Sequence, residues 1–417
     1  MSTRGAHLVE GDRRFTTGGG LLGRLFAPAF AAVVHSIDKR LEMGGIDATL
    51  PGGERRKLGF RAPGPTARVD LRSWMGLVRL ATSGSVGWYK AWELGEWSSP
   101  DPVPIFELFS ANAVSLGAVG RAKGPARWIN ALAHRLRDNA PTQARANIAA
   151  HYDLGNDFYS AWLDRTMTYS SAWWDRSGVS LAEAQQAKVA HLLDRLDLKH
   201  GDRLLEIGCG WGSLAIEAAE RGASVVGLTL STEQKAWAER EIAARGLSDR
   251  IEIRLQDYRD VSEQFDAVAS VEMVEAVGRR WWGAYLDCIA RNLKPNGRAA
   301  LQFIMMQPEV FERYARNADF IQTYIFPGGL LIHEPEFAGL ANERGLSWQD
   351  RSRDFGGDYA ETLKLWRANY DAALEQGTLQ GFSNEFHRLW RYYLMYCEGG
   401  FRGGAIGVAQ VTLARTA

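Results

Sequence analysis

The stretch RLLEIGCGWGSLAIEAAE, residues 203–220, decides the fold. Its opening RLLEI predicts a short buried strand, and its closing SLAIEAAE predicts a helix of good helix formers. Between them stand Gly208, Gly210 and Gly212, which leave the backbone free to approach a ligand closely. A strand, a glycine-rich turn and a helix in this order indicate the ligand-binding edge of an α/β sheet.

The spacing of these glycines narrows the class of ligand. A phosphate-binding loop would need a Lys and a Ser or Thr after its last glycine, and the Lys is absent here. The dinucleotide fingerprint G-x-G-x-x-G is not matched either, because the third glycine comes one position early. A nucleoside without a pyrophosphate fits the turn better, and S-adenosylmethionine (SAM) is the common one.

Downstream of Leu192, strand-like and helix-like segments alternate along the chain. The strand-like segments are RLLEIG, SVVGLTLS, IEIRLQDY, FDAVASVEM and RAALQFIMM. This alternation predicts an α/β fold, a doubly wound parallel sheet with helices on both faces. Ligands in such sheets bind outside the carboxyl ends of the strands. The turns expected to meet at that edge are residues 206–212, 227–231, 257–258 and 271–275.

The length and composition of the chain limit its class. At 417 residues it is too long for one ordinary core, so two domains are expected. The formal net charge is zero, and overall charge therefore predicts no nucleic-acid partner. Three cysteines without paired spacing, and no clean signal-peptide cleavage site, indicate a reducing, cytoplasmic compartment. No cluster of His, Cys and Asp has metal-ligand spacing, so no metal is predicted.

Changes of pattern along the chain predict four segments. Residues 1–20 are polar and glycine-rich and indicate a flexible tail, and residues 21–120 mix helical and strand patterns in a small α+β domain. Residues 121–146 predict a basic amphipathic linker helix, which can either lie on an anionic lipid surface or pack between domains. Residues 147–417 carry the alternating pattern and are expected to form the catalytic domain.

Seven stretches, in order, carry a resemblance to a known family: NIAAHYDLGNDFYSAWLDRTMTYSSAWW, LLEIGCGWGSLAI, VVGLTLSTEQ, EMVEAVG, DFIQTYIFPGG, DYAETLKLW and YCEGGFRGG. The chain resembles the cyclopropane-fatty-acyl-phospholipid synthases and the mycolic acid cyclopropane synthases. The resemblance implies a class I SAM-dependent methyltransferase with a helical cap, and an N-terminal domain that handles lipid. It also implies a substrate, the cis double bond of unsaturated phospholipid acyl chains, and a peripheral position on the inner face of the membrane. The oligomeric state is not readable, although relatives of this length are often homodimers.

The same resemblance assigns the cofactor-binding residues. Class I methyltransferases usually end the second strand with an acid that binds the ribose, whereas Thr229 stands there in this chain. A hydroxyl can still bond the diol, and Gln234 supplies a second partner, which is the pair typical of the cyclopropane synthases. The implied set comprises the cap pair, the glycines beneath the methionine, the ribose pair and the adenine pair: Tyr169 and Ser170, Gly208 and Gly210, Thr229 and Gln234, Asp257 and Tyr258.

In the family, a bound bicarbonate ion takes the proton that is released after methyl transfer, and a Cys, a Glu, a His, a Tyr and a backbone amide hold it. Carried over to this chain, the Glu is Glu275, the Tyr is Tyr359 and the amide is that of Ile304. Two positions depart from the pattern, since Ser171 replaces the Cys and Gln302 replaces the His. Serine and glutamine keep hydrogen-bond donors, so an anion cradle remains chemically feasible.

A second carboxylate, Glu272, precedes Glu275 by three residues. The two could approach each other and raise the pKa of one of them toward that of a base. The commoner role of such a glutamate is to cap a helix or to pair with an arginine such as Arg279 or Arg280, and this is the role we expect.

The product and two alternative functions stay open. The expected product is a cyclopropane ring, but if the proton leaves from a neighbouring carbon, the product is a methyl or methylene branch. Plant alkaloid N-methyltransferases resemble the catalytic domain, so a small-molecule N-methyltransferase is an alternative, against which the N-terminal domain argues. Because of Ser171 and Gln302, a lipid-binding protein that has lost catalysis is another.

Overall fold

The computed structural model describes residues 4–9, 27–117 and 154–416, and the chain forms two compact units. Unit 1 takes the described residues of Met1–Arg137, Gln307–Pro327 and Gln380–Ile406. Unit 2 takes those of Asp138–Met306, Gly328–Leu379 and Gly407–Ala417. Both units are therefore assembled from separate stretches of the sequence.

These units differ from the predicted segments. Two stretches of the predicted catalytic domain, residues 147–417, fold with unit 1. Within the predicted flexible tail, α1 (Ala6–Val9) is a short helix whose Leu8 is buried, and the Arg4 N–H donates to Gly381 O at 3.2 Å. The predicted basic helix, residues 121–146, lies outside the described residues.

Unit 1 contains a four-stranded sheet in the order β2-β1-β3-β4. β1 (Gly45–Thr49) and β2 (Arg55–Gly59) are antiparallel and are joined through two glycines at positive φ, Gly52 and Gly53. β3 (Thr66–Leu71) runs parallel to β1, and β4 (Trp97–Ser98) runs antiparallel to β3. The further elements are α3 (Ala27–Arg40), α4 (Met75–Glu93), α5 (Val103–Ala111), α6 (Ala113–Leu116), α14 (Pro308–Ala315), the π-helical turn η5 (Ile321–Ile325) and α17 (Asn384–Arg402).

Helix α17 approaches α5 closely because glycines remove side chains from the contact. A Cβ atom at Gly399 would lie 2.5 Å from the Cβ of Phe106, which is far closer than real side chains come. A Cβ atom at Gly403 would collide with the backbone oxygen of Glu107. The stretch YCEGGFRGG therefore serves helix packing within unit 1.

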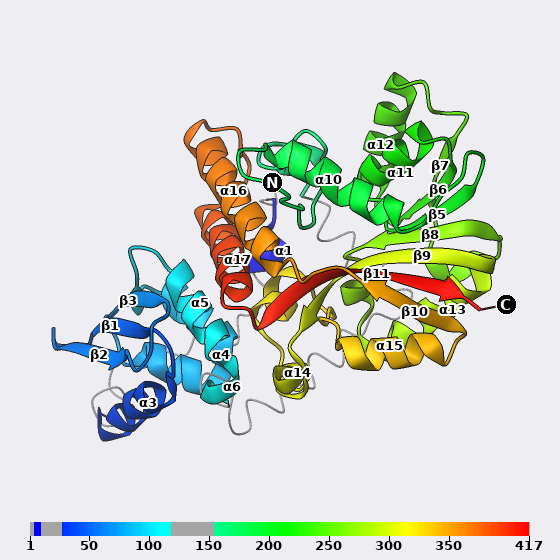
Figure 1. Cartoon of the computed structure of the whole chain (residues 1–417). Helices are drawn as coiled ribbons and strands as arrows, with labels where there is room; N and C mark the ends of the chain where they lie inside the picture. Colours follow the sequence, from blue (N-terminus) through cyan, green and yellow to red (C-terminus); the bar gives the residue numbers. More distant parts are fainter. Residues whose placement is uncertain (1–3, 10–26, 118–153, 417) are drawn as a thin grey trace. The chain divides into compact units, whose positions relative to one another are not determined.

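Unit 2 is built on a seven-stranded sheet in the order β10-β11-β9-β8-β5-β6-β7 (Figure 1). Neighbours from β9 to β7 pair in parallel, and β10 pairs antiparallel with β11. The predicted doubly wound α/β fold is confirmed. The strands are β5 (Arg203–Ile207), β6 (Ser224–Thr229), β7 (Ile251–Leu255), β8 (Phe265–Val271), β9 (Leu293–Met306), β10 (Leu346–Arg351) and β11 (Ile406–Arg415).

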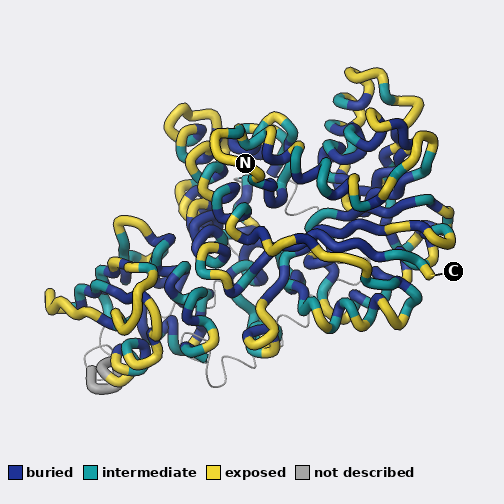
Figure 2. Tube along the Cα trace, in the orientation of Figure 1, coloured by how far each residue is buried: buried dark blue, intermediate teal, exposed yellow. Residues whose placement is uncertain are grey.

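Helices cover both faces of this sheet (Figure 1). α10 (Leu181–Asp194), α11 (Ser213–Glu220) and α12 (Thr232–Ala244) lie on one face, and α13 (Trp282–Asn292) and α15 (Glu334–Asn342) lie on the other. The central strands are buried along nearly their whole length (Figure 2), as expected of a sheet covered on both sides. α9 (Asn156–Ser160) and α16 (Gly356–Glu375) complete the unit.

The order of the strands fixes where a ligand can bind. After β5 the chain continues to β6 and β7 on one side, and then returns to β8 and β9 on the other side of β5. The carboxyl ends of β5 and β8 are therefore the switch point of the sheet, which is where ligands bind in sheets of this kind. Among the residues that the structure describes, no helix is both long and apolar enough to cross a bilayer.

Candidate active site

The glycine-rich turn after β5 presents backbone at the switch point. Gly208, Gly210 and Gly212 all have positive φ, at +82°, +52° and +92°. The N–H groups of Gly208 and Cys209 donate to the Leu228 oxygen at 3.1 and 2.8 Å, which holds the turn against β6. A Cβ atom at Gly210 would meet no atom within 4 Å, so this glycine borders open space. Such a bare turn fits a ligand that lies directly on the backbone.

The predicted ribose pair lies together at the end of the next strand. The Thr229 hydroxyl donates to Gln234 Oε1 at 2.8 Å and accepts the Ser231 N–H at 3.1 Å. The Ser231 hydroxyl in turn accepts the Gln234 N–H and caps α12. The structure thus brings Thr229 and Gln234 into one hydrogen-bonded unit beside the glycine turn.

The predicted adenine pair follows β7. The Asp257 carboxylate accepts hydrogen bonds from the Arg259 guanidinium at 2.6 and 2.8 Å and from the Arg259 N–H at 3.0 Å. Much of its hydrogen-bonding capacity is therefore used within its own turn. Tyr258 is buried, and burial raises the pKa of its hydroxyl, which stays neutral.

The predicted cap pair is tied to α10 and to an aromatic cluster. The Ser170 hydroxyl accepts a hydrogen bond from Lys188 Nζ at 2.7 Å, and the Ser170 backbone oxygen accepts one from Gln185 Nε2 at 2.9 Å. The Tyr169 ring lies 5.5 Å from that of Trp162 and 5.3 Å from that of Trp366. These contacts hold the Tyr169–Ser170 segment in one place within unit 2.

Three groups from distant parts of the sequence converge on Glu272, in the turn after β8. Its Oε1 accepts the Ser171 N–H at 2.9 Å and the Gln302 Nε2 at 2.8 Å, and its Oε2 accepts the Tyr359 hydroxyl at 2.9 Å. Glu272 itself has φ +47°, an uncommon conformation for a residue other than glycine. This carboxylate is held in place by three donors and is the centre of the polar cluster.

Glu275, the glutamate predicted to help hold the anion, neighbours Glu272 but has fewer hydrogen-bond partners. Its Oε1 accepts the Ile304 N–H, and its buried Oε2 has no hydrogen-bond partner among the described residues. Burial, reinforced by the charge of Glu272, raises the pKa of Glu275 to about 8. Glu275 is therefore mostly a neutral acid at pH 7.

Glu272 has more hydrogen-bond donors than Glu275 to stabilise a negative charge. Burial raises its pKa, but the Ser171 N–H, the Gln302 amide, the Lys188 charge and the Tyr359 hydroxyl all oppose that shift. Two neighbouring carboxyl groups whose environments differ in this way are suited to different roles, one as a base and one as a neutral partner. We assign the ionised role to Glu272.

This arrangement corrects two expectations. Glu272 neither caps a helix nor pairs with the expected arginines, because Arg279 binds Glu336 at 2.7 Å and Arg280 lies over the Trp281 ring. Separate bicarbonate does not fit either. Its predicted donors from Ser171, Gln302 and Tyr359 already bind the Glu272 carboxylate, and that of Ile304 binds Glu275. The Ser171 hydroxyl donates instead to the Ala172 oxygen.

Two buried residues of the cluster were not predicted from the sequence. Lys188 is almost fully buried on α10, and burial lowers the pKa of its ammonium group to about 8 against the attraction of Glu272, Asp164 and Glu206. Its position on the apolar face of a predictable helix is a signal that could have identified it. Gln410, on β11, is equally buried, and no local pattern distinguishes it from a core strand residue.

Comparison with known proteins agrees with this geometry. The family model described as mycolic acid cyclopropane synthetase matches residues 139–411. Tuberculostearic acid methyltransferase UfaA1 of Mycobacterium tuberculosis is 39% identical over 349 residues, which are 81% of this chain and 80% of that protein. Cyclopropane-fatty-acyl-phospholipid synthase of Escherichia coli is 38% identical over 300 residues, 69% of this chain and 75% of that one.

A solved structure leads to the same family. The crystal structure of the mycolic acid cyclopropane synthase CmaA1 with SAH and CTAB superposes with a TM-score of 0.61 at 33% identity, covering 65% of this chain and 98% of that one. The fold and the glycine-rich edge define a SAM-dependent methyltransferase. The chain belongs to the mycolic acid cyclopropane synthetase family.

Proposed function

We propose that this enzyme transfers the methyl carbon of SAM to the cis double bond of an unsaturated phospholipid acyl chain, with Glu272 as the base that takes up the released proton. The observation that supports this most directly is the convergence of three donors on Glu272, beside the glycine turn of the switch point. The family membership supports the cofactor and the lipid class.

Different residues of the chain would bind the cofactor and take up the proton. Gly208, Gly210, Thr229 and Gln234 would hold SAM, which supplies an electrophilic methyl group when bound. As the alkene attacks that methyl, its π electrons would form the new C–C bond, the bond from sulfur to the methyl carbon would break with its electron pair left on sulfur, and the other alkene carbon would become positively charged. The ionised Glu272 stabilises this charge and then accepts a proton.

Neutral Glu275 adds no second negative charge beside the base. A single fixed carboxylate therefore faces the positive charge.

Two products can follow from the same cation. Direct loss of a methyl proton closes a cyclopropane ring, whereas a hydride shift before that loss leaves a methylene branch. A saturated methyl branch would in addition need a reductant. We favour the methylene branch, because Ser171 departs from the ring-forming pattern and because UfaA1 is named as a tuberculostearic acid methyltransferase.

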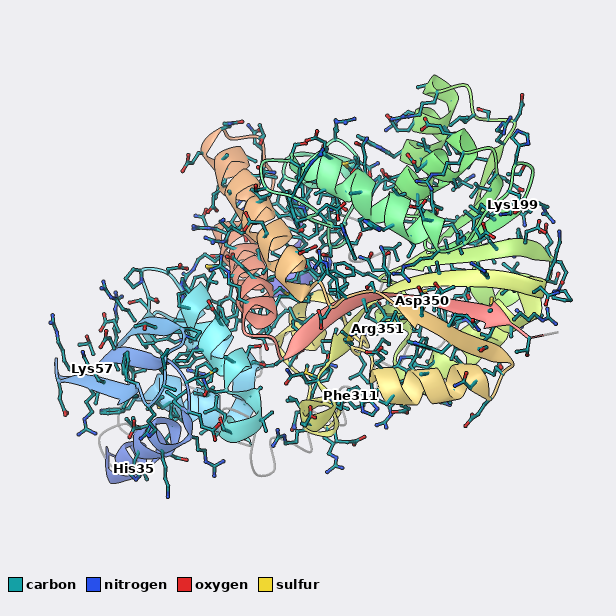
Figure 3. All side chains as sticks on the ribbon, in the orientation of Figure 1. His35, Lys57, Lys199, Phe311, Asp350 and Arg351 are labelled. Atoms are coloured by element: carbon teal, nitrogen blue, oxygen red, sulfur yellow. The ribbon has the colours of Figure 1, made fainter. Side chains whose placement is uncertain are left out.

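A peripheral position on the cytoplasmic face of the membrane is supported by the surface of unit 1. Phe60 and Met43 are 42% and 41% exposed, and the Phe60 N–H donates to Gly44 O, which places them at one end of the β1–β2 pair. Arg55, Arg56 and Lys57 lie exposed on the edge strand β2. Figure 3 labels Lys57 on this strand. Cations beside exposed apolar side chains suit a membrane rich in anionic lipid.

The proposed function is tested with purified protein, methyl-labelled SAM and vesicles of dioleoyl phosphatidylglycerol. Gas chromatography and mass spectrometry of the fatty acids should show a labelled CH2 added to the oleoyl chains. Retention time separates ring from branch. Absence of label from every unsaturated lipid, or transfer to small amines alone, would contradict the proposal.

A further inference from the structure

Gln410 connects the backbone of α10 to the polar cluster. Its side chain is fully buried, and its Nε2 donates to the backbone oxygen of Lys188 and to Gln302 Oε1, each at 3.1 Å. The nitrogen of the same Gln302 amide donates to Glu272 Oε1 at 2.8 Å. A continuous line of hydrogen bonds therefore runs from a helix backbone, through two amides, to the carboxylate.

The backbone carbonyl of Lys188, the first group in this line, fixes the direction of each hydrogen bond that follows. A backbone carbonyl can only accept, so the group of Gln410 beside the Lys188 oxygen must be its NH2. That NH2 also faces Gln302 and requires the Gln302 oxygen as its acceptor. The Gln302 NH2 is thereby turned toward Glu272, which as a carboxylate can only accept. Without Gln410, the Gln302 amide could turn over and place its oxygen against the carboxylate.

We propose that Gln410 is a positioning residue for the base: together with the Lys188 carbonyl it holds the Gln302 amide in the orientation that donates to Glu272. This inference rests on the proposed function and deepens it. Gln410 acts through Gln302 and not on the carboxylate itself.

The groups around Glu272 show what the wrong orientation would do. Glu272 is flanked by Glu275, by the Lys188 cation and by the Tyr359 hydroxyl. Exchanging the Gln302 donor for an oxygen would add repulsion at Oε1 and would favour the protonated carboxylate. A protonated Glu272 cannot take up a proton, so turnover would fall while the cofactor site stayed intact.

The test is a double-mutant cycle with Gln302→Met and Gln410→Met, which keep the side-chain length and remove the amide. Two quantities are measured in each protein: kcat for transfer to the vesicles described above, and the pKa of Glu272 from its carboxyl band in infrared difference spectra against Glu272→Gln. We expect each single change to lower kcat roughly tenfold, the effect of about one hydrogen bond, and to raise the pKa. The double variant should be no slower than Gln302→Met alone.

The proposal would be overturned if the two losses of kcat multiplied in the double variant. It would also be overturned if the pKa of Glu272 in Gln410→Met equalled that in the wild-type protein. Thr412→Val, also buried on β11, is the matched control and should leave kcat and the pKa unchanged. If Gln410→Met does not fold, Gln410→Glu replaces it, since a carboxylate of similar volume would turn the Gln302 NH2 away from Glu272. If the wild-type enzyme methylates no lipid, the proposed function fails, while the infrared pKa still tests the role of Gln410.

Discussion

The paired parallel strands β5 and β8 end at the same edge of the sheet, but their turns use different parts of the chain. The turn after β5 carries three glycines at positive φ and offers backbone. The turn after β8 carries Glu272 and Glu275 and offers two buried carboxyl groups. One turn is suited to binding a nucleoside cofactor, and the other to holding and moving a charge.

The two turns also differ in how far apart in the sequence the residues lie that hold each turn in place. The glycine turn depends on residues within a few positions of each other and on the adjacent strand β6. The carboxylate turn depends on the segment before α10, on β9, on α16 and, through Gln302, on β11. Substitutions can therefore distinguish the two turns. Changes in the glycine turn should affect SAM binding, and changes in the carboxylate turn should affect turnover.

The largest effect is expected from Glu272→Gln. It keeps the shape of the side chain and removes the base, so methyl transfer should fall about a thousandfold or more, the scale of general base catalysis. The SAM affinity, measured by calorimetry, should change little, because the glycine turn is untouched. Retention of more than a tenth of the wild-type rate would show that another group takes the proton.

The next effect is expected from Gly210→Ala, which alters the other turn. Its Cβ would enter the open space beside the backbone, so the SAM affinity should fall roughly tenfold or more, while saturating SAM restores much of kcat. Gly246→Ala is the matched control, since Gly246 also has positive φ and also meets no atom within 4 Å. Both should lose about 1 kcal/mol of stability, and only the first should lose affinity. An equal loss of affinity in both would contradict the assignment.

Tyr359→Phe should have a smaller effect, because two donors to Glu272 remain. We expect kcat to fall about tenfold at neutral pH. Because one donor that lowers the Glu272 pKa is lost, the fall in activity on acidification should begin at a higher pH than in the wild type. The pH dependence of kcat measures this directly, and an unchanged profile would mean that the Tyr359 hydroxyl does not act on the base.

The smallest effect concerns stability. The pKa of Glu275 is raised from 4.5 to about 8, so the folded state binds a proton more tightly than the unfolded state. The contribution of this proton to the free energy of unfolding is complete below the pKa of Glu275 in the unfolded state. It is lost as the pH rises toward 8, and the free energy of unfolding then falls by at most about 1.4 kcal/mol per pH unit. Glu275→Gln should flatten this part of the curve in urea denaturation between pH 5 and 8. A slope equal to that of the wild type would contradict it.

The same contrast explains what the sequence could and could not predict. The parallel sheet and the glycine turn follow from local patterns, and the structure has both where they were expected. The Thr229–Gln234 pair follows from the family resemblance, and the structure joins the two side chains by a hydrogen bond. The resemblance also grouped Ser171, Gln302 and Tyr359 around one point, and the structure brings all three onto Glu272. It could not show that Glu272 fills that point, because a carboxylate three residues from another looks the same whether it caps a helix or accepts three donors.

The composition of unit 1 has a consequence for biosynthesis. Helix α17 leaves the ribosome long after its partner α5, because the whole of the intervening sequence is translated between them. The α5 surface of the nascent chain therefore stays uncovered until α17 has been translated. Expression of the first 137 residues alone should yield an aggregation-prone fragment, and co-expression of the remainder in trans would be needed to rescue it.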